Sequence, residues 1–275
     1  MFTIGFTGFS FSCAAIWQYE NMKKHAMLQH AKSKAEELFR NWSENMPKAG
    51  SIRRELNEFW NQLSEADKLY APILAINLLV FALWKVPSLQ PTMVRYFTGS
   101  PHLTNKGLPM LLSGFSHQSL IHLACNMFVL HSFMGPMVSN LGKEQFMGIY
   151  MSSCVITSFF SHMSKIASGR VGASLGASGA ICTVLGIFAT LAPDAQLQII
   201  FLPFFGFSAS IGIKCLMALD TAGLVAGWQV FDHAAHLSGV LFGIWWCRQG
   251  HDLIWNQRQH VMQWWHDLRN KPPPL

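Results

Sequence analysis

Residues 235–243 read AHLSGVLFG, and this stretch decides how two helices of the chain can meet. Gly239 and Gly243 are four residues apart, so they lie on one face of a helix, one and two turns beyond His236. Small residues at this spacing let helices approach closely inside a membrane. The stretch therefore predicts a helix that packs tightly against a neighbour and carries a histidine near the contact.

Residues 174–180, SLGASGA, predict the neighbour. Gly176 and Gly179 flank Ser178, which opens an apolar segment. The start of a helix offers free N–H groups and a positive dipole, both of which favour a developing negative charge. A serine beside a histidine supplies a nucleophile and a base, the parts that acyl transfer requires. We therefore predict Ser178 as nucleophile and His236 as general base and then general acid.

His122 and Asn126 stand four residues apart in another apolar segment and share one helical face. Taken singly, a serine in a membrane span bonds its own helix and a histidine packs without a further role. Polar groups are nevertheless costly in a span, so each is a candidate functional residue, and together they are much less common. We expect His122, Asn126 and the Ser178 backbone N–H to form an oxyanion hole.

The composition points to a membrane protein. Of the 275 residues, 51% are hydrophobic and 12% are charged, and half of the charged residues fall between 18 and 70. A soluble domain would carry charge throughout, whereas membrane spans explain the uneven distribution. We expect six core spans, at about 70–86, 118–140, 145–166, 178–193, 208–228 and 233–248. The net charge of +6 forms no basic face apart from these spans, so no nucleic-acid partner is predicted.

The predicted fold class is an all-α polytopic membrane protein with four regions. These are an extra N-terminal transmembrane helix (1–17), a soluble helical segment broken at 47–50 (18–69), a six-helix core (70–248) and a C-terminal tail (249–275). Lysine and arginine concentrate in the soluble segment and the tail, which an odd number of crossings places on one side. The positive-inside rule makes that side cytoplasm-like.

Other residues leave alternatives open. The six cysteines form no CxxC pair or cluster with histidine and are interpreted as small apolar residues, with disulfides as the minor alternative. A transporter or channel built on the twelve histidines is disfavoured, because they are scattered and only His233 and His236 have ligand-like spacing. Asp220 lies deep in a span and needs a partner, either in a polar cavity or at a substrate entry. Asp232 is either a loop carboxylate or the orienter of His236. His117 is expected to brace a loop.

The three motifs occur in order on separate predicted spans, and in this the chain resembles the rhomboid intramembrane serine proteases. Their pattern of HxxxN, GxSG and AHxxGxxxG is met at His122, Ser178 and His236. The extra first span is similar to that of the mitochondrial members. The chain departs from many bacterial members at Cys182, where they carry an aromatic residue.

The resemblance implies a six-helix core and a Ser–His dyad with no orienting carboxylate, metal or organic cofactor. It implies hydrolysis of peptide bonds in or near the transmembrane segments of single-span proteins, in the mitochondrial inner membrane. A catalytically silent relative that binds membrane segments is the alternative; loss of the serine or the histidine would mark it, and both are present. Neither the residues nor the resemblance predict an oligomeric state.

Overall fold

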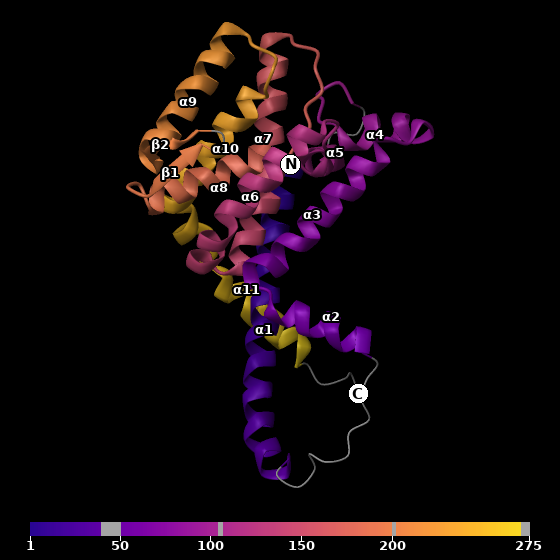
Figure 1. The fold of residues 1–275 in the computed structure, drawn as a ribbon, viewed down its shortest axis with the longest axis vertical. Coiled ribbons are helices and arrows are strands. Elements are labelled where there is room, and N and C mark those ends of the chain that lie inside the picture. The colour runs from indigo at the N-terminus through magenta and orange to yellow at the C-terminus, as the bar shows by residue number, and fades with distance from the viewer. Residues whose placement is uncertain (40–50, 104–106, 200–201, 271–275) are drawn as a thin grey trace.

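The computed structural model describes residues 1–39, 51–103, 107–199 and 202–270 (Figure 1). Helices dominate these residues, with one short hairpin. In chain order the elements are α1 (Phe2–Phe39), α2 (Ser51–Gln62), α3 (Glu65–Leu83), η1 (Pro87–Leu89), α4 (Gln90–Phe97), α5 (Gly107–Leu112), η2 (Ser113–Phe115), α6 (Leu120–Leu141), α7 (Lys143–Ser168), α8 (Ser178–Leu191), β1 (Gln196–Ile199), β2 (Leu202–Ser208), α9 (Ala209–Ala226), α10 (His233–Trp245), the π-helix η3 (Trp246–Trp255) and α11 (Arg258–Arg269).

Each of the six predicted core spans corresponds to a helix. In order they are α3, α6, α7, α8, α9 and α10. Among the described residues, three helices are long and apolar enough to cross a membrane, namely α3, α6 and α9, and α8 is a shorter apolar helix. The structure therefore agrees with the prediction of a helical membrane protein with several spans.

Helix α8 lies inside the bundle, against α6, α7, α9 and α10 (Figure 1). A helix enclosed in this way must be apolar around its whole circumference. Its side chains meet this requirement: Ile181, Val184 and Ile187 are buried in the same core cluster as Leu130 of α6 and Tyr150 of α7. The central position of α8 places its first residue, Ser178, at the end of a helix that is largely buried.

Helix α1 runs from Phe2 to Phe39 without a break, so the expected boundary between residues 17 and 18 is not a helix end. Neither glycine nor proline occurs there to stop the helix. Its apolar half packs along α7, where the Ser10 hydroxyl donates to the Gly148 carbonyl. Phe11 stacks on Trp246, with ring centroids 4.8 Å apart. This half is therefore part of the core. The predicted break at 47–50 lies outside the described residues.

The region predicted as a tail is helical through residue 269 and contacts α1. Arg258 donates to Gln18, with Nε and Oε1 2.7 Å apart. The Trp265 indole donates to Glu20 at 2.7 Å, and Arg269 pairs with the same carboxylate. The last described helix, α11, therefore packs against the middle of α1.

The hairpin was not predicted. Strands β1 and β2 pair antiparallel between α8 and α9, with Gln196 opposite Ser208 and an irregularity at Gln198 and Ile199. The segment is too short to show a clear alternation of apolar and polar residues, which is the pattern that identifies a strand.

The stack of Phe11 on Trp246 predicts how much α1 stabilises the core. Replacing a buried phenylalanine by alanine leaves a cavity, so Phe11→Ala should lower the free energy of unfolding by about 3 kcal/mol. Phe9 lies on the same helix but is 65% exposed, and Phe9→Ala should change stability little. Unfolding in mixed detergent micelles measures both. Equal losses would show that the stack is not what holds α1.

Candidate active site

The contact between α8 and α10 brings two backbones together. A Cβ atom on Gly239 would lie 2.3 Å from the Gly179 carbonyl oxygen, and one on Gly243 would lie 2.3 Å from that of Thr183. From the other side, a Cβ on Gly186 would lie 2.6 Å from the Val240 carbonyl oxygen. No side chain fits at these positions, so the helices can approach this closely only because glycine occupies them.

This approach sets Ser178 against His236. The Ser178 Oγ and His236 Nε2 atoms are 2.8 Å apart, a hydrogen-bond distance. Ser178 is the first residue of α8, and His236 lies in the first turn of α10. Both line a cavity of about 380 Å³, together with His122. The structure therefore collects three of the predicted site residues at one place.

The turn before Ser178 explains the neighbouring glycine. Gly176 has a φ of +126°, a conformation that residues with a Cβ rarely adopt. A Cβ there would also lie 2.8 Å from the His122 ring. The cap residue of α8, Ala177, provides no side-chain hydrogen bond. The backbone N–H of Ser178 is consequently not taken by a capping side chain at the helix start.

His117 contacts the turn that precedes Ser178. Its Nε2 accepts a hydrogen bond from the Ala177 N–H at 3.4 Å, and its ring contacts that of His122 with centroids 4.9 Å apart. Burial, and then the nearby His122, lower the pKa of His117 to about 3. The ring therefore stays neutral at physiological pH and can act as an acceptor. From the sequence we expected only a loop brace.

Asn126 is placed differently from His122. Its Nδ2 donates to the His122 backbone carbonyl at 2.9 Å, and its side chain is buried without lining the cavity. The two residues share a helical face, but only His122 lies beside Ser178. One of the two Nδ2 hydrogens of Asn126 is already bound within its own helix.

Asp220 is the carboxylate that faces His236. Its Oδ1 lies 3.4 Å from His236 Nδ1 and 2.8 Å from His233 Nδ1. The side chain is buried, at 1% exposure, in α9. One carboxylate is thus shared by two imidazoles. The sequence indicated that Asp220 needed a partner, but it did not indicate which one. The side chain that Asp220 faces depends on how α9 is rotated against α10.

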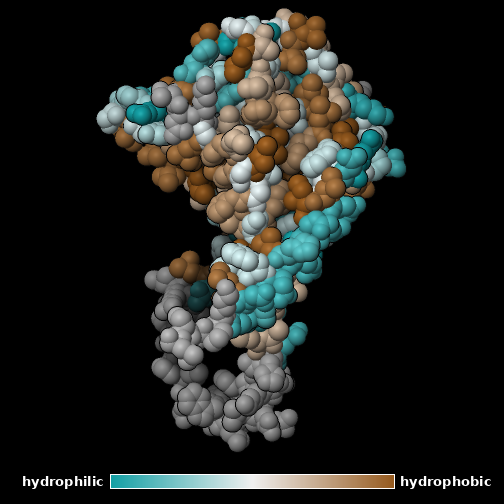
Figure 2. Space-filling view, turned by 180° about the vertical axis from the view of Figure 1, so that it is seen from behind, coloured by the Kyte–Doolittle hydropathy of each residue, from teal (hydrophilic) through white to brown (hydrophobic). Residues whose placement is uncertain are grey.

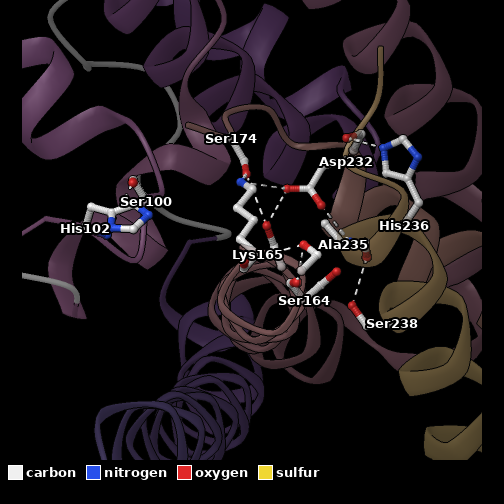
Figure 3. A network of polar contacts seen from close by, with 12 residues as sticks. Ser100, His102, Ser164, Lys165, Ser174, Asp232, Ala235, His236 and Ser238 are labelled. Carbon is white, nitrogen blue, oxygen red and sulfur yellow. Dashed lines mark hydrogen bonds and ion pairs between the residues drawn. The ribbon is translucent and has the colours of Figure 1, made fainter. Parts of the chain in front are cut away.

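Asp232 serves a different network (Figure 3). Its Oδ1 accepts from the Ala235 N–H at 3.1 Å and so caps α10, while Oδ2 accepts from Ser161 at 2.5 Å and lies 3.5 Å from Lys165 Nζ. Figure 3 shows the carboxylate directed at Lys165 and Ser174, away from His236. Burial raises the pKa of Asp232, but Lys165 and the hydrogen bonds outweigh it, and the pKa lies below its ordinary value.

An aromatic ring lies beside His236, although α8 carries Cys182 at the position where many bacterial members of the resembled family have an aromatic residue. Cys182 is buried against Gly239. Phe231, just before α10, lies instead with its ring centroid 6.1 Å from that of His236, at an angle of 38°.

Within the part of the chain that the structure describes, no three His, Cys, Asp or Glu side chains are grouped so as to hold a metal ion.

The structure is thus a helical membrane bundle in which a serine and a histidine meet at the starts of two helices. The sequence profile of the rhomboid domain matches residues 105–250. The chain belongs to the rhomboid family.

Its relatives are mitochondrial. The chain is 50% identical over 274 residues to the presenilin-associated rhomboid-like protein of Homo sapiens, covering 99% of this chain and 71% of that protein. The mouse (Mus musculus) protein of that name gives the same identity and coverage. Rhomboid protein 1 of Saccharomyces cerevisiae is 34% identical over 195 residues, 70% of this chain and 56% of the relative. The chain is a mitochondrial membrane protein with several spans.

The glycine contact predicts the effect of a single methyl group. Gly239→Ala would force α8 and α10 apart, since the new Cβ meets the Gly179 carbonyl, and overpacking typically costs about 1–3 kcal/mol. We expect lower stability and loss of Ser178 labelling by a fluorophosphonate probe. Gly135→Ala in α6 is the matched control, because a Cβ there meets nothing within 4 Å. Unchanged labelling in folded Gly239→Ala would contradict the prediction.

Proposed function

We propose that this chain is an intramembrane serine endopeptidase that hydrolyses peptide bonds in or near transmembrane segments of membrane-anchored proteins. One observation carries the proposal: the Ser178 hydroxyl lies 2.8 Å from His236 Nε2 at a helix start. A serine hydroxyl is a poor nucleophile unless a base takes its proton, and this contact provides one. Membership of the rhomboid family supports the same reaction.

In the proposed reaction, His236 accepts the hydroxyl proton as Ser178 Oγ bonds to the peptide carbonyl carbon. The carbonyl oxygen becomes negative and receives hydrogen bonds from the Ser178 N–H and from His122. When the C–N bond breaks, His236 returns the proton to the leaving amine, and water then hydrolyses the acyl-enzyme in the same two steps. Asn126 would be the third oxyanion donor, through the Nδ2 hydrogen that does not bind the His122 carbonyl.

Asp220 adds a third member to the proposed Ser–His pair. A carboxylate beside the far ring nitrogen of a catalytic histidine holds the correct tautomer and stabilises the protonated ring. Asp220 Oδ1 lies 3.4 Å from that nitrogen of His236, and its hydrogen bond to His233 fixes its position. We therefore propose that Asp220 orients His236, in place of the unaided dyad that the family resemblance implied.

We also propose that α7, α8 and α10 cross the membrane with α3, α6 and α9, and that the first half of α1 adds a seventh span in the inner mitochondrial membrane. A polar layer marks one boundary: Asn21 bonds Glu144 at 2.6 Å, and Lys143 bonds Glu65 at 2.5 Å. Figure 2 shows apolar side chains over the body of the bundle and hydrophilic ones where it narrows.

The proposed substrates are single-span proteins that approach through the lipid. Helix α9 suits this approach, because only 17% of its 18 residues are buried. At the cavity, Val230 and Phe231 form an apolar rim and are 82% and 58% exposed. A bound segment must unwind to present its carbonyl to Ser178, because the peptide groups of an intact helix are hydrogen-bonded internally.

The catalytic assignment predicts an order of severity for purified variants reconstituted in liposomes. Ser178→Ala and His236→Ala should reduce cleavage to background. Asp220→Asn should approach the loss of about 10⁴-fold that a triad carboxylate gives, and Asn126→Ala should cost about 10²–10³-fold.

The matched control for Asp220→Asn is Asp232→Asn, because asparagine still caps α10 and Asp232 faces Lys165 instead of the base. Its cleavage rate should stay close to wild type. The rate constant for cleavage of a fluorescent single-span substrate, measured for Asp220→Asn and for Asp232→Asn, compares the two carboxylates. If Asp232→Asn were the more damaging of two equally folded proteins, Asp220 would lose its role.

The need to unwind predicts substrate preference. Glycine costs about 1 kcal/mol more than alanine or leucine in a helix, so two Leu→Gly changes beside the cut should raise kcat/KM by up to about 30-fold. The same two changes at the far end of the span are the control. Equal rates for both substrates would rule out unwinding at the cut as a limiting step.

A further inference from the structure

Helix α2 carries an apolar face. Leu56, Phe59 and Trp60 stand at the spacing of one helical face. Glu58 and Asn61 lie on the opposite side. A helix divided in this way has one side that avoids water and one that is stable in it.

The described part of the chain leaves this face uncovered. Leu56 is 63% exposed, Phe59 62% and Trp60 46%. Three large apolar side chains exposed together on one turn and a half of helix mark a surface that meets an apolar partner.

The position of α2 indicates the partner. Ser64 caps α3, and only Leu63 and Ser64 separate the two helices. The three Cα steps from Gln62 to Glu65 span about 11 Å at most, so the end of α2 cannot move far from the start of α3. That start lies in the polar layer, where Glu65 meets Lys143. Figure 1 shows α2 lying crosswise to α1 beneath α3. The apolar face is therefore held at the boundary of the proposed spans.

The residues of this face suit a lipid surface. Tryptophan and phenylalanine are typical of helices that lie in the interface, where apolar side chains enter the acyl region and polar ones stay in water. Within α2, Arg53 and Arg54 are balanced by Glu55 and Glu58. The helix has no net charge to attract anionic lipid, so its binding must come from apolar area.

We infer that α2 is an interfacial helix, with Leu56, Phe59 and Trp60 inserted into the leaflet from which α3 starts. This rests on the proposed membrane arrangement of the spans, and not on catalysis. In this position α2 anchors the entry of α3, whose first turn also bonds α6 through Asp67 and His131 at 3.0 Å.

Photocrosslinking of the full chain tests the inference. Phe59 is replaced by p-benzoylphenylalanine in the Ser178→Ala protein, so proteolysis does not affect the readout. The protein is reconstituted in liposomes of neutral phosphatidylcholine, irradiated and analysed by mass spectrometry. The same replacement at Asn61, exposed on the opposite face of α2, is the matched control. The same replacement at Leu79, which is 60% exposed in α3, reports whether α3 itself contacts lipid.

We expect lipid adducts at positions 59 and 79 but not at 61, and adducts at 59 that persist in high salt. Adducts at 79 with none at 59, or equal adducts at 59 and 61, would overturn the inference while leaving the spans intact. Crosslinking of position 59 to a second copy of the chain would also overturn it. Absence of adducts at both 59 and 79 would overturn the membrane arrangement together with the inference.

Discussion

The backbone contact between α8 and α10 is the interaction on which the rest of the structure depends. Carbonyl oxygens of one helix occupy the space where a Cβ would stand on Gly239 and Gly243 of the other. Helices in lipid gain little from burying apolar surface, so such close packing is what holds them together. The same contact fixes the distance between Ser178 and His236. Stability and site geometry are therefore set by the same glycines.

Two carboxylates hold the helix that carries His236, and each has defined partners. Asp220 meets two histidines, and Asp232 meets Lys165 and Ser161. Removing a polar partner from such a group is costly where water is excluded. The first cluster joins α9 to α10, and the second joins α7 to the start of α10. The helix that carries His236 is thus held by two carboxylates with different tasks.

Local patterns in the sequence were sufficient to predict the helices of the core and the meeting of Ser178 with His236. Apolar runs mark spans directly, and the small residues around Ser178 and His236 identify two faces that can touch. The partner of Asp220 was not predictable, because it depends on the rotation of α9. The bond of Asn126 to its own helix was not predicted, because the side chain can bond its own helix or face the cavity, and the packing of α6 decides between the two. The continuity of α1 was readable from the sequence, since neither glycine nor proline stands near residues 17 and 18.

The length of α8 has a consequence for the depth of Ser178 below the membrane surface. Its 14 residues measure about 21 Å, whereas the hydrocarbon layer is about 30 Å thick. In the proposed arrangement at least one end of α8 must then lie below the membrane surface, and the cavity opens at the end that carries Ser178. The shortfall of about 9 Å makes a recess that water can fill from above and a transmembrane segment can enter from the side. In the proposed reaction, the number of residues in α8 thus sets how far beneath the surface a bond is cut, and one added turn would lift Ser178 by about 5.4 Å.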